Sequence, residues 1–295
     1  MESFDPGQPL AVSLRAVALT HLDAAIESAR AIATEPGPAI HAVRKRIKQL
    51  RGLLRLVRPG LGDRFTPLDD ALRAVAHTLA PLREAEVLVQ SVALLSREAG
   101  EPFQPLQAWA AKRLARKTAQ RVPAALSAAT LAGLEALRER VPAWHLDGDD
   151  TTILATGLAR PVRQCRKGLE TVRARRDIEA LHDLRRQVKY HGMHCALLAP
   201  ALPRDMAARI ALANRIGDAL GTDHDLADLV NRLARGGGKI APKKTRRRAI
   251  RLARGIGKRL QEQAIADARI LFRERPKALA RQLDGYPDAR LVRHA

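Results

Sequence analysis

Two copies of one polar pattern, H-x-x-R-x-x-x-K, have the chemistry to bind an anion. The first copy consists of His41, Arg44 and Lys48. The pattern recurs 141 positions later as His182, Arg185 and Lys189. Arginine offers phosphate a planar fork of donors, lysine offers a mobile positive charge, and histidine can donate from a ring nitrogen. The pattern therefore indicates phosphate binding, and it contains no obvious nucleophile or general base.

The pattern also marks an internal duplication. Residues 41–88 align with residues 182–229 without gaps, and eight positions are identical. Three of the identities form the polar pattern, and the other five are Leu or Pro. Chance similarity between two amphipathic helices could match the leucines, but it would not usually match the polar residues. We therefore expect two related halves.

Helical geometry places the basic residues of the first copy on one face. At 100° per residue, that face carries His41, Arg44, Lys45, Lys48, Arg51 and Arg55. Residues 36–62 contain no Asp or Glu, whereas exposed helix faces usually mix both signs of charge. The face is thus predicted to meet an external anion, with an ordinary solvated basic face as the alternative.

The second copy has a shorter basic face, formed by His182, Arg185, Arg186 and Lys189, because Gly192 and Ala196 replace Arg51 and Arg55. A later stretch, 229–261, contains twelve basic residues and no acid. Within it, an arc about 80° wide on an ideal helix carries Lys243, Arg247, Arg251, Arg254 and Lys258. The same offset of 141 aligns Arg113 with Arg254 and Lys117 with Lys258. We include these seven residues in the predicted binding set.

Composition limits the class of partner. The 295 residues carry 52 Lys and Arg against 31 Asp and Glu, a net charge of +21, which favours a polyanionic partner such as nucleic acid, an anionic membrane surface or a phosphate polymer. Two cysteines are too few for a disulfide framework. The absence of a long apolar run predicts no membrane span, and the N-terminus lacks the basic region of a signal peptide. We expect a cytoplasmic protein.

Ala-, Leu- and Arg-rich segments with only 3% aromatic residues favour helices over strands. Helices are expected near 10–33, 39–58, 67–97, 104–121, 123–140, 151–175, 178–198, 204–234, 243–273 and 276–284. The segment 141–150, with Pro142 and Gly148, is the best boundary. The sequence thus predicts an all-α fold of two tandem four-helix-bundle-like halves, 1–145 and 146–295, related by approximate two-fold pseudo-symmetry.

The motif segments resemble a known family, the conserved histidine α-helical domain (CHAD). The resemblance rests on HAVRKRIKQLRGLLRLVRP followed by LAPLREAEVLV, and on LHDLRRQVKYHGMHCALL followed by LGTDHDLADL. It implies two four-helix bundles around a basic groove that binds inorganic polyphosphate, with association to polyphosphate granules in bacteria. Its binding positions correspond to His41, Arg44, Lys48, Arg51, His182, Arg185 and Lys189. Gly192 and Met193 stand where members often carry aromatic residues.

Two other functions compete with this interpretation. An HD-type metal-dependent phosphohydrolase is suggested by His224 and Asp225, but His191 and His194 lie on the packing side of their helix and cannot share a metal with His182. Nonspecific nucleic-acid binding is the second alternative, although few aromatic residues are available for base stacking. We therefore expect a non-enzymatic polyphosphate-binding protein that needs no metal or cofactor. It can also bind other polyanions such as phosphate, sulfate or nucleic acid. The sequence leaves its oligomeric state open.

Overall fold

The computed structural model describes residues 2–120, 123–175, 178–281 and 283, and this part of the chain contains helices and no strand. The α-helices are α1 (Leu10–Arg30), α2 (Pro36–Leu56), α3 (Arg58–Leu61), α4 (Phe65–Thr78), α5 (Ala80–Ala99), α6 (Gln104–Gln120), α7 (Pro123–Arg140), α8 (Asp150–Arg175), α9 (Ile178–Leu198), α10 (Pro203–Gly236), α11 (Lys243–Leu271) and α12 (Pro276–Arg281). Short 3-10 turns cover Ala31–Ala33, Gly62–Arg64, Val141–Ala143 and Gly237–Lys239. The prediction of an all-α fold is confirmed.

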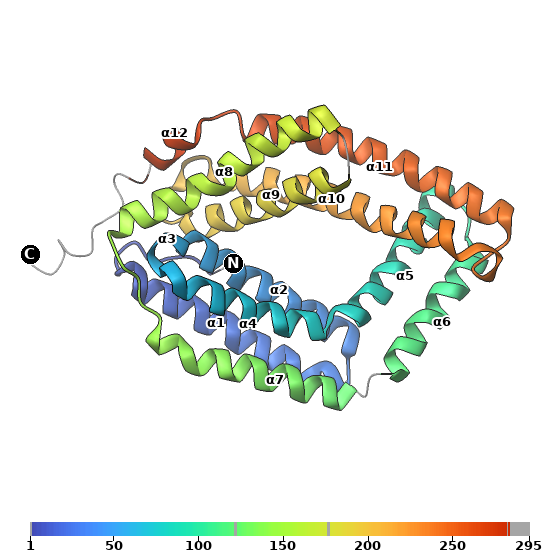
Figure 1. The fold of residues 1–295 in the computed structure, drawn as a ribbon, viewed down its shortest axis with the longest axis horizontal. Coiled ribbons are helices and arrows are strands. Elements are labelled where there is room, and N and C mark those ends of the chain that lie inside the picture. Colours follow the sequence, from blue (N-terminus) through green and yellow to red (C-terminus); the bar gives the residue numbers. More distant parts are fainter. Residues whose placement is uncertain (1, 121–122, 176–177, 282, 284–295) are drawn as a thin grey trace, which may run out of the picture.

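Helices α1, α2, α4 and α7 pack together as one bundle (Figure 1). The apolar residues of α2 recur every three or four positions and are almost fully buried, with Val43 and Leu50 at 0% exposure and Ile47 at 1%. Helix α2 begins with proline in its first turn. Proline costs no hydrogen bond there, because an N–H group in the first turn has no partner within the helix. Because the apolar face of α2 is buried in this bundle, its basic face is turned the other way.

A second group of helices joins the first through α2. Helices α8 and α9 pack with α10 and α11, and α2 in turn contacts both α8 and α9. The junction is close: a Cβ at Gly157 would lie 1.8 Å from the Leu56 carbonyl oxygen, so only glycine fits there. His194 Nε2 also donates to the Gly52 carbonyl oxygen at 3.1 Å. One continuous hydrophobic core spans both groups.

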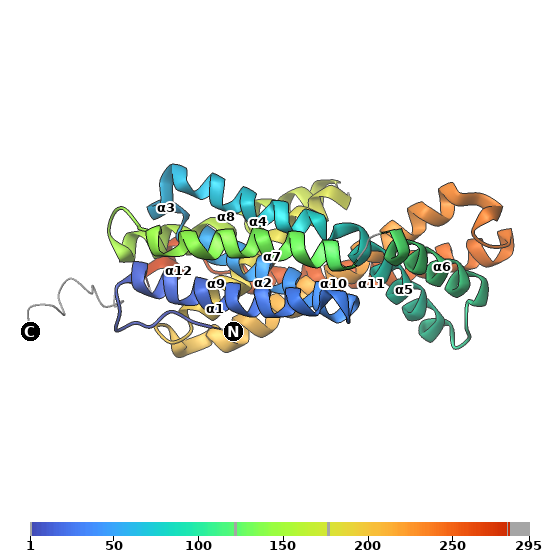
Figure 2. The same ribbon diagram turned by 90° about the horizontal axis from the view of Figure 1, so that it is seen from below.

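Helix α5 leaves the first bundle and packs against the far ends of α10 and α11, and α6 packs against α5. The sequence predicts one helix over 67–97, but this is wrong: α4 ends at Thr78 and α5 begins at Ala80, with Pro81 in its first turn. The extension has a core of its own, which includes Leu88, Phe103, Leu229 and Ile256. Figure 2 shows α5, α6 and the ends of α10 and α11 projecting beyond the other helices.

The two hydrophobic cores therefore do not coincide with the expected halves 1–145 and 146–295, because α5 and α6 share a core with α10 and α11. The two-fold relation between the halves stays a prediction.

In the described part of the chain, no helix has the length and apolar character needed to cross a membrane.

Candidate polyanion-binding site

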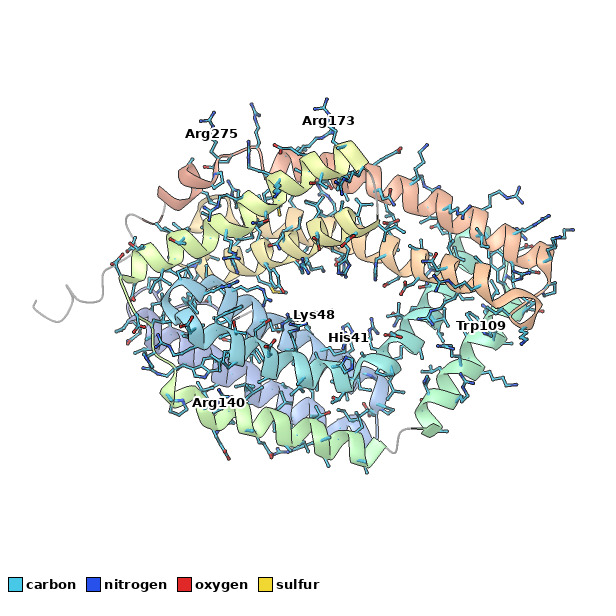
Figure 3. The ribbon with its side chains drawn as sticks, viewed as in Figure 1. His41, Lys48, Trp109, Arg140, Arg173 and Arg275 are labelled. Carbon is cyan, nitrogen blue, oxygen red and sulfur yellow. The ribbon has the colours of Figure 1, made fainter. Side chains whose placement is uncertain are left out.

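Lys48 lies among four other cations drawn from both copies of the repeated pattern. Solvent reaches its side chain, yet desolvation, together with the charges of Arg44, Arg185, Lys189 and Arg83, lowers its pKa to about 8. These five residues, on α2, α5 and α9, are called the motif cluster below. Figure 3 shows Lys48 and His41 projecting from α2 toward the space between the two groups of helices. A like-charge cluster of this kind favours an anionic ligand.

The two copies hold their arginines in the same way. Arg44 Nη1 donates to the Ala76 carbonyl oxygen at 2.7 Å, and Arg185 Nε donates to the Gly217 carbonyl oxygen at 3.2 Å. Both the donors and the acceptors are separated by the repeat offset of 141. In each case one N–H group anchors the guanidinium, and the remaining donors stay available. The duplication thus preserves a tertiary contact as well as a sequence pattern.

Small residues on α10 make room for the second copy. A Cβ at Gly217 would lie 2.6 Å from Lys189 Cε, and a Cβ at Gly221 would lie 2.9 Å from an Arg185 terminal nitrogen. Both side chains therefore lie across the backbone of α10. Lys189 Nζ also forms an ion pair of 2.8 Å with Asp218, an exposed residue that an external anion can replace as its partner.

The motif histidines have equivalent neighbours. Desolvation, followed by the charges of Arg83, Lys48 and Lys45, lowers the pKa of His41. Desolvation and the neighbouring His224 lower the pKa of His182, and the rings of His182 and His224 are 5.0 Å apart. Arg83 and His224 again differ by 141 positions. Both motif imidazoles are therefore less readily protonated than an ordinary histidine, so they contribute less positive charge at neutral pH.

One acid accompanies the arginine in each copy. The charge of Glu84 acts on Arg44, and the charge of Asp225 interacts with Arg185, again at equivalent positions. Desolvation raises the pKa of Asp225, although the charges of Arg185, His224 and Arg83 oppose that shift. Because Arg83 belongs to the first copy, this interaction also joins the two copies at the cluster.

Two of the predicted binding residues are occupied inside the protein. Arg51 and Arg55 both bind the buried Asp69 of α4, at closest distances of 2.8 and 2.7 Å. Desolvation would raise the pKa of Asp69, but hydrogen bonds from the two arginines outweigh it and lower the pKa to about 2. Arg55 also stacks over Tyr190 at 4.5 Å. The segment 36–62 contains no acidic residue itself, but α4 supplies the carboxylate that pairs with these two arginines.

Arg113 extends the positive charge from the motif cluster along α5 and α6. Desolvation and the charges of Arg232 and Arg116 lower its pKa, while Glu84 opposes the shift. Glu84 pairs with Arg232 at 3.6 Å and also acts on Arg44, so it connects Arg113 with the motif cluster. Lys117 lies one turn farther along α6 and is half-buried. Sequence reasoning missed Arg83 and Arg232, although Arg83 could have been found as the residue aligned with His224.

The other predicted residues lie on more exposed surfaces. Lys45 is exposed beside His41, and Arg186 forms an exposed local ion pair of 2.8 Å with Asp183. The five cations of α11, Lys243, Arg247, Arg251, Arg254 and Lys258, are exposed as well. Helix α10 lies between α11 and the space that Lys48 faces (Figure 1). The structure thus places the α11 cations apart from the motif cluster.

The packing histidines behave as expected. His191 and His194 are 0% and 1% exposed, which confirms that they lie on the packing side of α9. Burial lowers the pKa of each to about 3. Among the described residues, no group of three or more His, Cys, Asp or Glu side chains is placed to hold a metal ion.

Comparisons with known proteins agree with this architecture. The CHAD domain family model matches residues 16–234. The crystal structure of the CHAD domain from the plant Ricinus communis is similar, with a TM-score of 0.63 and 16% identity over 97% of this chain and 95% of that one. PptA from Streptomyces chartreusis has a TM-score of 0.56 and 16% identity over 93% of this chain and 100% of its own. No curated protein matches the sequence. Since the family model covers most of the chain, including both copies of the repeated pattern, the protein belongs to the CHAD domain family.

Proposed function

We propose that the motif cluster binds inorganic polyphosphate without catalysis. The observation that carries the proposal is the convergence of Lys48, Arg44 and Arg83 with Arg185 and Lys189 from the other copy of the repeat. Their mutual repulsion is relieved by a ligand with several closely spaced negative charges. A polyphosphate chain supplies such charges, and the family resemblance of both motif segments implies the same ligand.

The kinds of side chain favour binding over reaction. Arg44 and Arg185 keep free guanidinium donors for phosphate oxygens, while Lys48 and Lys189 supply mobile charges. None of the five residues in the motif cluster is a nucleophile suited to phosphoryl transfer. The proposal includes the location that the family resemblance implies, which is association with polyphosphate granules in the cytoplasm.

The test is a variant in which Arg44, Lys48 and Arg185 are all replaced by Gln. Glutamine keeps an N–H donor for the Ala76 and Gly217 carbonyls, so the fold should be retained by circular dichroism. The control replaces three scattered exposed residues, Arg97, Arg140 and Arg173, by Gln and lowers the net charge equally. We expect the cluster variant to lose at least about tenfold in affinity for short polyphosphate, since three phosphate contacts are removed, and the control to lose little.

Two results would contradict the proposal. Equal losses in the two variants would show that net charge, rather than the motif cluster, determines binding. Competition over a salt series supplies the second test, because equal affinity per charge for polyphosphate, DNA and RNA would show that the site does not select polyphosphate.

A further inference from the structure

The exposed face of α11 carries a second concentration of positive charge that the motif cluster does not use. It consists of Lys243, Arg247, Arg251, Arg254 and Lys258 and is called the α11 ridge below. All five residues are exposed, and among the described residues none of them forms an ion pair. By contrast, the neighbouring Arg248 and Arg259 pair with Glu101 and Glu98 of the adjoining extension.

Packing fixes the direction in which the ridge faces. Helix α11 buries Ala249, Ala253 and Ala264 in the core, and the ridge is centred about 120° around an ideal helix from that buried face. Helix α10 covers the side of α11 that is nearer the motif cluster (Figure 1). The ridge is thus an outer, exposed surface that a wide and rigid partner can reach.

The spacing of the ridge suits a charged backbone. Its residues follow each other at intervals of four, four, three and four positions, which corresponds to about 22 Å along the helix axis. Duplex DNA presents one phosphate charge for about every 1.7 Å of its axis, so several ridge residues can reach phosphates at once. Three of the five are arginines, whose planar forks suit phosphate oxygens.

We infer that the α11 ridge binds the phosphate backbone of double-stranded nucleic acid without sequence specificity. The ridge contains no aromatic residue, so it lacks the stacking platforms with which single strands are usually held. It also lies on a face of the molecule open to a duplex, whose major groove alone is about 12 Å wide. The motif cluster is less open: α2 and α9 meet at Gly52 and His194, one helical turn beyond Lys48.

The inference and the proposed polyphosphate site can be tested separately with three variants of equal net charge. The ridge variant replaces Arg247, Arg251 and Arg254 by Gln, and the cluster and scattered variants are those described above. Binding of a labelled duplex of about 20 base pairs is followed by fluorescence anisotropy between about 50 and 200 mM salt. Short polyphosphate is titrated into the same three proteins.

We expect the ridge variant to lose at least about tenfold in duplex affinity, and the slope of log affinity against log salt to fall by about 2.7, which is 0.9 for each lost phosphate contact. Its affinity for short polyphosphate should stay close to that of the wild type. The scattered and cluster variants should keep most of their duplex binding.

Equal duplex binding by the ridge and scattered variants would overturn the inference. So would an equal loss in the cluster variant, because the duplex would then share the motif cluster. Vesicles containing anionic lipid serve as the remaining probe: ridge-dependent binding to vesicles without ridge-dependent binding to duplex would assign the surface to membranes instead. Unchanged polyphosphate binding in the cluster variant would refute the proposed function alone, because the duplex measurement does not depend on it.

Discussion

Polyphosphate binding should weaken as the pH rises from 7 to 9, and Lys48 should be the cause. In the free protein the pKa of Lys48 is lowered to about 8 by desolvation and by four neighbouring cations. A bound polyanion offsets the repulsion and moves the pKa back toward its ordinary value of 10.5. Binding therefore takes up a proton in this pH range, and by linkage the affinity falls as protons become scarce.

The size of the effect follows from the two pKa values. Unbound Lys48 is protonated in about ten molecules of eleven at pH 7 and in about one of eleven at pH 9, whereas the bound form stays protonated. Full restoration of the ordinary pKa therefore gives an affinity loss of about tenfold. Because the side chain is exposed and its charge is screened, we expect a loss of about three- to tenfold.

Isothermal titration calorimetry at constant ionic strength provides the assay. Comparison of buffers with different ionisation enthalpies should also reveal an uptake of up to about half a proton per site at pH 8. In Lys48→Arg the cation does not titrate, so the affinity should stay nearly constant over this range. Lys45→Arg is the matched control, because Lys45 is exposed one turn earlier, and it should behave like the wild type. If Lys48→Arg showed the same pH dependence as the wild type, the reasoning would be refuted.

Three further predictions concern the surroundings of the motif cluster. In Gly217→Val, the new side chain should displace Lys189, so polyphosphate affinity should fall several-fold while circular dichroism stays unchanged; unaltered affinity would show that the position of Lys189 is unimportant. Asp69→Asn should lower the free energy of unfolding at pH 7, measured by chemical denaturation, by about 2 to 4 kcal/mol. The reason is that Arg51 and Arg55 lose the carboxylate with which they pair, whose pKa they lower to about 2. The affinity for polyphosphate should not fall. Burial lowers the pKa of His191 and of His194 to about 3, so as the pH falls below 6.5 these histidines take up protons in the unfolded chain before they do so in the folded protein. Each histidine should therefore lower the free energy of unfolding by about 2 kcal/mol between pH 7 and 5. His194→Gln keeps a donor for the Gly52 carbonyl and should remove about half of this combined pH dependence.

The sequence predicts most helix boundaries because proline and glycine punctuate them. Expected segments such as 104–121 and 178–198 agree with α6 and α9 to within one residue. The sequence does not predict the short helix α3, which lies largely between the expected segments 39–58 and 67–97, or the break at Leu79. At Leu79 the apolar periodicity continues through the break, and Pro81 is tolerated in the first turn of a helix. That break determines where α5 goes, and α5 carries Arg83 to the motif cluster.

Partners that are distant in sequence explain why only part of the site is predictable. The basic face of α2 is evident from local spacing, but the capture of Arg51 and Arg55 by Asp69 depends on how α4 packs against it. Likewise, the spacing on α11 correctly indicates a continuous basic stripe but contains no information about which side of α10 it will occupy. Local patterns predict which face of a helix is charged, whereas tertiary packing decides what that face meets.

The two copies of the repeat differ in one respect that bears on function. They share the arginine anchored to a helix carbonyl, the adjacent acid and the motif histidine, but Arg83 of the first copy is replaced by His224 in the second. A guanidinium keeps its charge at any physiological pH, whereas the ring of His224 lies 5.0 Å from the ring of His182 and lowers the pKa of that histidine. The first copy therefore contributes one more permanent cation to the motif cluster than the second copy does. After duplication, this single substitution is enough to make the two sides of a shared anion site unequal in positive charge.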